Sequence, residues 1–195
     1  MNNPFWDAMV RSRACAYTAA SKFEKAHVGR QPVWCFDRFG QSMTRLPDGR
    51  HVEIGGEHED YYDPDFCIYN DVVVYHTNGT FDIFGYPEAD FPPTDFHSAS
   101  YIAPYIYIIG CLGYPHQRRP GETPIYRLHC EFWTLERIDA TGDSPGWIHR
   151  HQAKVINGDR IQIEGGKNDC GDQTELLENN RTYIFDPAER SWRIC

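Results

Sequence analysis

Three short apolar runs in this sequence each end at a glycine, and the glycines are evenly spaced. The runs read HVEIGG at 51–56, IYIIGC at 106–111 and IQIEGG at 161–166. Their first glycines, Gly55, Gly110 and Gly165, lie 55 residues apart in both intervals. A fixed period of this length indicates a repeated supersecondary unit, and it constrains the fold more strongly than local propensity does.

The segments around each glycine have the composition of antiparallel strands joined by tight turns. The hairpin before each glycine turns at Pro47-Asp48-Gly49, near Pro104 and at Asn157-Gly158-Asp159. The Asp-Gly and Asn-Gly pairs are strong hairpin signals, because these residues tolerate the positive φ angles that tight hairpin turns need. After each glycine come a polar loop, a tyrosine and a large aromatic residue: Tyr75 and Phe81, Tyr126 and Trp133, Tyr183 and Trp192. Each unit is therefore predicted to form four antiparallel strands.

This order of motifs resembles the kelch repeat, which forms one blade of a β-propeller. The resemblance covers 33–195, with blades expected at about 33–84, 96–138 and 150–195. Unit two departs from the family at Gly110-Cys111, where two glycines are expected, and unit one has Phe81 in place of tryptophan. The resemblance implies a mainly β fold, a kelch-like partial β-propeller of three four-stranded antiparallel blades. A generic β-sandwich is the alternative.

The N-terminal segment, residues 1–32, belongs to no blade and is predicted to be helical. Residues 4–27 lack glycine, and Asn3 before Pro4 is a good N-cap. We expect a helix over 4–27 that covers an open end of the arc through apolar side chains: Phe5, Trp6, Met9 and Phe23. Closed propellers have typically four to eight blades, so a homodimer that completes the ring is the alternative.

Composition excludes several classes of protein. The 195 residues suit one domain, and a hydrophobic fraction of 41% suits a packed core. No run of about 18 apolar residues exists, so no membrane span is predicted. A net charge of −9 argues against nucleic acid as a partner. Seven cysteines without a CxxC pair argue against disulfides and structural zinc, and favour a cytoplasmic location.

Catalytic and metal-binding motifs are weak. His149 and His151 have metal-like spacing if they share a strand, and His97 holds the matching place in unit two. The favoured interpretation is that these histidines hold turns by hydrogen bonds, so no metal or cofactor is predicted. The acid-rich stretch 57–65 lacks the ligand pattern of a calcium loop and is predicted to be a solvated loop. No Ser-His-Asp arrangement, phosphate loop or HExxH motif appears, so catalysis is not expected.

The distribution of charge is the strongest functional signal. The loops expected to share one face, 57–66, 85–95, 111–124, 139–147 and 167–178, hold 15 acids and three bases. That face carries −12 while the rest of the chain carries +3. A face of one sign attracts a partner of the opposite sign and raises its association rate.

The sequence therefore predicts a non-catalytic binding module that grips a basic protein through acidic and aromatic residues. One role for such a binder is that of an immunity protein that neutralises a basic toxin. The residues predicted to contact the partner are Glu57, Glu59, Asp60, Tyr61, Tyr62, Asp63, Asp65, Glu88, Asp90, Tyr114 and Trp147. Because kelch-like propellers also include copper-radical oxidases and mutarotases, the alternative is a sugar-active enzyme with a polar pocket on the loop face.

Overall fold

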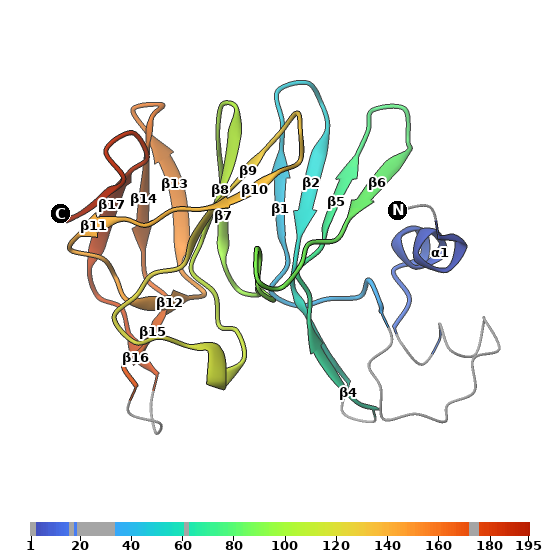
Figure 1. The fold of residues 1–195 in the computed structure, drawn as a ribbon, viewed down its shortest axis with the longest axis horizontal. Helices are drawn as coiled ribbons and strands as arrows, with labels where there is room; N and C mark the ends of the chain where they lie inside the picture. The colour runs from blue at the N-terminus through green and yellow to red at the C-terminus, as the bar shows by residue number, and fades with distance from the viewer. Residues whose placement is uncertain (1–2, 16–17, 19–33, 61–62, 172–175) are drawn as a thin grey trace.

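The structure, a computed structural model, describes residues 3–15, 18, 34–60, 63–171 and 176–195. It is mainly β, with one N-terminal helix and several antiparallel sheets that do not close into a ring (Figure 1). The predicted mainly β class is confirmed. The propeller arrangement of the three large sheets stays a prediction.

Three large sheets follow one another along the chain, and each contains four consecutively paired antiparallel strands. Sheet 1 has the order β1-β2-β5-β6, with bounds Ser42–Arg45, His51–Ile54, Val72–Tyr75 and Phe81–Phe84. Sheet 2 has the order β10-β9-β8-β7, where β7 to β10 are Ser98–Ile102, Tyr105–Ile109, Ile125–His129 and Leu135–Arg137. Sheet 3 contains β13, β14, β17 and β18, which are Gln152–Ile156, Arg160–Glu164, Thr182–Asp186 and Ser191–Ile194. A fifth strand, β11 (Thr141–Gly142), pairs with β18 in parallel.

The long connections between second and third strands contain secondary structure of their own. The β3–β4 hairpin (Glu57–Asp60 and Asp63–Ile68) follows β2, and the 3₁₀ helix η1 (Pro115–Gln117) follows β8. A small sheet joins β12 (Trp147–His149), β15 (Lys167–Asp169) and β16 (Leu177–Glu178). The prediction of a plain solvated loop at 57–65 is therefore wrong for its described residues. Backbone pairing in the folded chain overrides the low strand propensity of acidic residues.

The apolar core lies between neighbouring sheets because strand residues alternate between two faces. Val52 and Ile54 of β2 pack against Ile106 and Ile108 of β8 in the cluster between sheets 1 and 2. Tyr107 and Ile109, the alternate residues of β8, pack in the cluster between sheets 2 and 3. Each fully buried aliphatic side chain contributes about 1.5–3 kcal/mol. Sheet 2 is thus apolar on both faces and fixes the positions of its two neighbours.

Two of the tryptophans that the repeat pattern predicts as packing residues lie between sheets, whereas Tyr75 of sheet 1 does not. Trp192 is buried in the cluster between sheets 2 and 3, and Trp133 packs against the cluster between sheets 1 and 2. Tyr75 faces the other side of sheet 1, where its hydroxyl donates to Glu53 at 3.0 Å. The outer face of sheet 1 therefore needs its own cover.

Helix α1 (Pro4–Ser12) covers that face. Asn3 is the N-cap, and its side chain accepts from the N–H of Phe5, as the sequence predicts. Met9 and Val10 are buried in a third cluster that contains Val73 and Ile83 of sheet 1; Phe5 and Trp6 pack around it half-buried.

The helix ends earlier than predicted. Arg13 adopts a left-handed conformation with φ of 48°, and its N–H donates to the carbonyl of Met9. Its guanidinium pairs with Glu53, which is buried in sheet 1. The predicted span to residue 27 is therefore too long, because a tertiary ion pair is made where the helix stops. The rest of that span, including Phe23, lies mostly outside the described residues.

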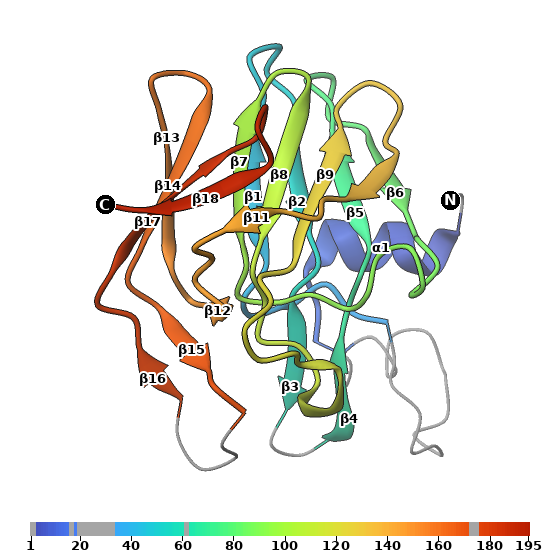
Figure 2. The same ribbon diagram turned by 60° about the vertical axis from the view of Figure 1, so that its left-hand side comes forward.

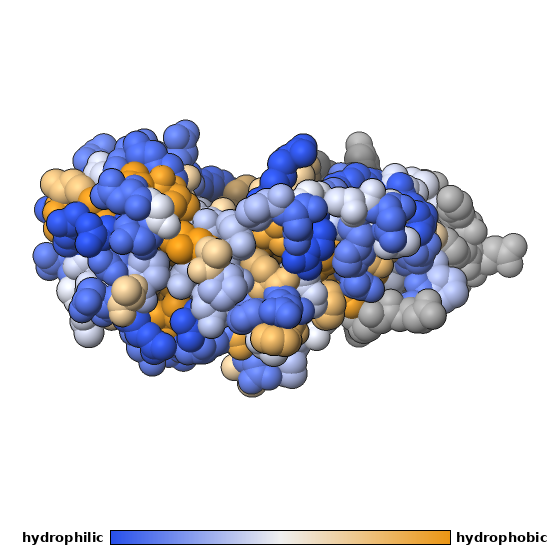
Figure 3. Space-filling view, turned by 90° about the horizontal axis from the view of Figure 1, so that it is seen from above, coloured by the Kyte–Doolittle hydropathy of each residue, from blue (hydrophilic) through white to orange (hydrophobic). Residues whose placement is uncertain are grey.

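The outer face of sheet 3 is polar. The outward residues of β14 are Arg160, Gln162 and Glu164, which alternate with the buried Ile161 and Ile163. Arg160 pairs with Asp186 of β17 at 2.9 Å. Seen from the side of the short turns, the surface is mostly hydrophilic, with apolar residues visible between polar ones (Figure 3). Sheet 3 thus ends the series with a face suited to water.

The repeat glycines lie directly after the second strand of each sheet, as predicted, and all three have positive φ. A Cβ at Gly55 would overlap the carbonyl oxygen of Thr94, and one at Gly110 would overlap that of Ile148. A Cβ at Gly165 would meet nothing within 4 Å. The first two glycines therefore permit close contact with the segment that enters the next sheet, whereas Gly165 makes no such contact.

Replacement of two of these glycines separates the conformational cost from the contact. Gly110→Ala and Gly165→Ala both place alanine at a similar positive φ, 72° and 66°, which costs about 1–2 kcal/mol. Gly110→Ala must also displace the Ile148 carbonyl, so we expect a further loss of about 1–3 kcal/mol. Urea unfolding of both variants measures the difference, and equal losses would contradict the contact at Gly110.

Candidate functional site

The long connections of the three sheets lie on one side of the molecule. The β3–β4 hairpin, η1, β12 and the β15–β16 hairpin lie below the sheets in Figure 1, opposite the short hairpin turns, and the turned view in Figure 2 keeps this division. Hydrogen bonds join neighbouring connections: the Ile68 N–H donates to the Tyr114 hydroxyl at 2.9 Å, and Arg118 pairs with Asp169 at 3.2 Å. The connections between second and third strands thus share one side of the molecule, which we call the loop side, whereas part of the predicted 139–147 loop forms β11 beside sheet 3.

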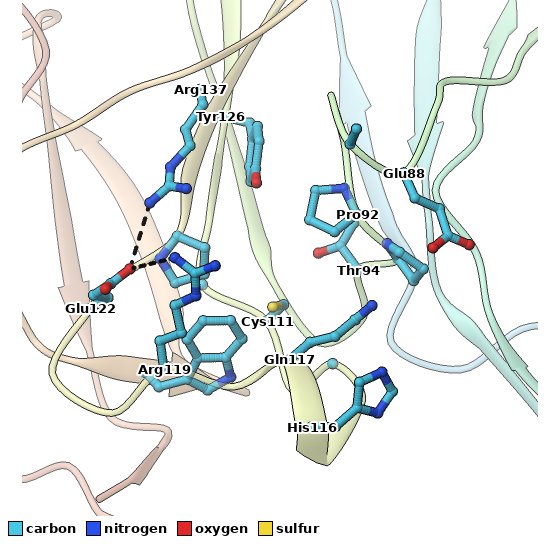
Figure 4. Close-up of a pocket in the computed structure, with 16 residues that line it drawn as sticks. Glu88, Pro92, Thr94, Cys111, His116, Gln117, Arg119, Glu122, Tyr126 and Arg137 are labelled. Atoms are coloured by element: carbon cyan, nitrogen blue, oxygen red, sulfur yellow. Dashed lines mark ion pairs between the residues drawn. The ribbon is translucent and has the colours of Figure 1, made fainter. Parts of the chain in front are cut away.

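A pocket of about 380 Å³ opens on the loop side, between the connection that leaves sheet 1 and sheet 2 (Figure 4). Thr94, Gly110 and Cys111 lie in its deeper part and are buried. Its lining also carries four exposed charged residues: Glu88, Arg119, Glu122 and Arg137. We call this site the polar pocket. Its volume is within the range of small-molecule sites.

Cys111 supplies a neutral surface to the polar pocket. Burial raises the pKa of its thiol to about 12, so the thiol stays protonated at neutral pH. The thiolate is the reactive form of cysteine, and its fraction is therefore very small here. Cys111 thus contributes a polarisable wall and not a nucleophile. All seven cysteines of the chain are free.

Two arginines share one carboxylate on another wall. Arg119 lies 3.8 Å and Arg137 lies 3.5 Å from the same oxygen of Glu122, and Arg137 also lies 3.4 Å from Asp139. The side chains of both arginines are at least half exposed, and such pairs contribute little to stability. Each guanidinium carries five N–H donors, so both keep donors for a further acceptor.

Tyr126 of β9 also lines the polar pocket. It is 9% exposed, and its hydroxyl points into the space between the arginine wall and Pro92 in Figure 4. Burial raises the pKa of Tyr126, so the hydroxyl remains a proton donor. No hydrogen bond formed among the described residues uses this hydroxyl.

A buried polar network holds the segment that follows β8. The Asp95 carboxylate is buried and accepts from the Gly113 N–H at 2.7 Å. The carbonyl of Leu112 accepts from Arg118 at 2.9 Å and from the Trp147 indole at 3.1 Å. Burial raises the pKa of Asp95. These contacts fix the backbone around Cys111, so the polar pocket is formed before any ligand enters.

Two residues predicted to contact a partner are buried. Glu57 is 8% exposed at the start of β3, and Trp147 is 7% exposed on β12, where its indole donates to Leu112. Both hold the loop side together, so neither offers its side chain to a partner in this structure. Burial of a carboxylate beside other connections depends on how the sheets pack, which the local sequence does not reveal.

The other predicted contact residues lie in three places. Glu88 and Asp90 are exposed in the connection that leaves sheet 1. Tyr114 is half-buried, with its ring against Phe66 and His116. Four acids lie on the β3–β4 strands: Glu59, Asp60, Asp63 and Asp65. Tyr61 and Tyr62 lie outside the described residues. The acids of the β3–β4 hairpin thus lie on a different element from Glu88 and Asp90, of which Glu88 lines the polar pocket.

The loop side is less uniformly acidic than the sequence count suggests. Glu122 and Asp139 pair with arginines, and Glu178 pairs with Lys167 at 3.3 Å. Asp95 and Glu57 are buried. The β3–β4 hairpin therefore remains the densest acidic segment on this side.

Of the residues that line the polar pocket, the sequence singled out Glu88 and Trp147 as partner contacts but neither of the arginines. Arg119 lies in the connection after β8 and Arg137 at the end of β10, and neither belongs to a motif. Tyr126 was predicted only as a packing residue of its unit. The folded sheets bring these three side chains together, and no spacing rule connects them.

No protein-family model matches this chain, and no curated protein matches it significantly. Among the residues that the structure describes, no group of three or more His, Cys, Asp or Glu could hold a metal ion. No described helix combines the length and the apolar composition needed to cross a bilayer.

Buried histidines join each sheet to the next behind the polar pocket. His97 Nε2 lies 2.7 Å from the Ser42 hydroxyl, and His151 Nε2 lies 2.8 Å from the Ser98 hydroxyl. His97 Nδ1 also lies 3.3 Å from the Thr94 hydroxyl of the pocket. The histidines do form hydrogen bonds at matching repeat positions, but the Nε2 bonds join neighbouring sheets and do not hold turns as predicted. His149 and His151 do not share a strand, because Arg150 between them has a φ of 55°.

Acid should weaken the fold through these histidines. Burial lowers the pKa of His97 to about 3 and that of His151 to about 4, whereas an unfolded histidine titrates near 6.5. Between those values the unfolded chain binds protons that the folded chain does not, so the stability contributed by these histidines falls as pH decreases from about 6.5 to about 4. Urea midpoints measured from pH 7 to pH 4 should fall, and the fall should be smaller in His97→Gln and His151→Gln than in the exposed control His116→Gln. An identical decline in all three variants would contradict this assignment.

Proposed function

We propose that the three large sheets are blades of an open, kelch-like propeller. Three observations support this: the same strand order in each sheet, the glycine after each second strand, and the serine–histidine bond between successive sheets. The outer faces of the series are not apolar, since α1 covers sheet 1 and the outward residues of β14 in sheet 3 are polar. These faces disfavour a homodimer that completes the ring.

We propose that the protein is a non-catalytic binding module that grips a basic protein partner through the loop side. The densest acidic segment, the β3–β4 hairpin, would make the main contact, and Glu88 and Asp90 would extend it. Both hairpins of this side lie beyond the large sheets in Figure 1. Electrostatic complementarity of this kind acts chiefly on association rate and specificity.

One observation carries this proposal. The register of the β3–β4 hairpin places Asp60 directly opposite Asp63. Like charges at directly opposed strand positions are destabilising. A cationic surface bound to the hairpin would offset this repulsion, which gives a physical reason for placing two acids opposite each other. A basic toxin neutralised by this chain as its immunity protein is one partner of the required chemistry, in a reducing compartment that suits seven free cysteines.

The second candidate function is a sugar-active enzyme that uses the polar pocket. The pocket combines Tyr126 and Trp147 with charged groups, a composition common in sites for polar small molecules. Nuclear magnetic resonance exchange measurements on reducing sugars, with and without the protein, test for catalysed interconversion of anomers. Catalysis that disappears in Arg137→Gln would favour this second candidate.

Charge reversal in the hairpin tests the binding proposal. We expect Glu59→Lys, Asp60→Lys and Asp63→Lys together to slow association with the partner. The association rate of this variant should also depend less on salt, because salt screens attraction between charges over about 10 Å at 0.1 M. Affinity capture from the native host, with mass spectrometry, identifies the partner, and surface plasmon resonance measures the rates.

The matched control reverses three exposed acids in the short turns on the opposite side: Glu131→Lys, Asp159→Lys and Glu189→Lys. It changes the net charge equally, so a basic partner should bind the control nearly as fast as the original protein. A captured partner whose association rate responds equally to both triple variants, or to neither, would overturn the proposal.

A further inference from the structure

The polar pocket contains a hydrogen-bond donor that the folded chain does not use. Tyr126 is 9% exposed, and its ring is fixed edge-on against Phe91 with centroids 5.1 Å apart. Its hydroxyl points into the pocket in Figure 4 and has no hydrogen-bond partner among the described residues. The ring of Tyr126 is buried, but its oxygen is not among the fully buried polar atoms that lack a partner, so water reaches it and an acceptor on a ligand can replace that water.

The two arginines give the sign of the ligand. Arg119 reaches the pocket from the connection after β8 and Arg137 from the end of β10, and both meet at Glu122, which cannot satisfy ten N–H donors. The distances to Glu122, 3.8 and 3.5 Å, are longer than those of strong charge-assisted hydrogen bonds. A second carboxylate between the guanidiniums would therefore gain good contacts without breaking strong ones.

The rest of the lining gives the size and character of the ligand. Pro92, Pro124 and the buried Trp147 offer apolar surface, and the volume of about 380 Å³ exceeds what an inorganic anion fills. Glu88 and Gln117 come from the lining away from the arginines in Figure 4 and supply polar groups for a second end.

We propose that the polar pocket binds a small organic acid, whose carboxylate contacts Arg119, Arg137 and the Tyr126 hydroxyl while its body lies against Pro92 and Trp147. This site does not depend on the proposed protein partner, since the pocket residues lie apart from the acids of the β3–β4 hairpin. The network around Asp95 and Leu112 keeps the site formed in the free protein.

Isothermal titration calorimetry of the full chain tests the proposal with matched probes at millimolar concentration. The acids are succinate and L-glutamate, their neutral counterparts are succinamide and L-glutamine, and inorganic phosphate is the third arm. We expect saturable binding of at least one acid and none of its amide. The proposal is overturned if no acid binds, if an acid and its amide bind equally, or if phosphate alone binds.

Two variants locate the bound acid. Tyr126→Phe removes only the hydroxyl, so we expect about tenfold weaker binding, the loss of one hydrogen bond to a charged group. Its melting temperature should change little, because the hydroxyl makes no hydrogen bond among the described residues. Arg119→Gln with Arg137→Gln should weaken binding by about tenfold or more.

Arg193→Gln is the control. Arg193 is exposed on the outer face of sheet 3, and its replacement also removes a guanidinium charge. It should leave the affinity unchanged. Binding that survives unchanged in Tyr126→Phe and in the double arginine variant would place the acid elsewhere and overturn the proposal, as would an equal loss in Arg193→Gln.

Discussion

The three sheets depend on a joint that is made twice, where the backbone after a second strand meets the segment entering the next sheet. The N–H of Gly56 donates to the Thr94 carbonyl at 2.8 Å, and the N–H of Cys111 donates to the Ile148 carbonyl at 3.0 Å. A side chain at the preceding residue would overlap the same carbonyl. The glycine before each donor therefore sets how closely two sheets approach. The side chains of the apolar clusters fill the space between the sheets at that separation.

The two ends of the series solve the problem of an uncovered sheet in different ways. Sheet 1 turns Val73 and Ile83 outward, and α1 buries them with Met9 and Val10. Sheet 3 instead turns Arg160, Gln162 and Glu164 outward, where water can solvate them. Terminal units of repeat proteins need a polar outer face or a cap for solubility.

The polar pocket lies between the two joints. Thr94 of the first joint lines it, as do Gly110 and Cys111 of the second joint at the end of β8. The connections that continue from the joints differ in length and sequence between the sheets, so they can build a site at one place in the series without repeating it elsewhere. The same connections place the acidic β3–β4 hairpin on the loop side. Rigid sheets therefore position variable segments, the arrangement in which binding residues usually occur.

The sequence by itself determined the strands, the hairpin turns, the repeat glycines and the start of α1 at Asn3 and Pro4, because these depend on side chains a few residues apart. The number of four-stranded units also followed from the period. Only the tertiary structure decided that α1 stops at Arg13 beside Glu53, that Glu57 and Trp147 are buried, and that Arg119, Arg137 and Tyr126 meet around one pocket. Those outcomes depend on contacts between separate elements of the fold, and such contacts are fixed by the packing of strands and connections, which local pattern and propensity do not specify.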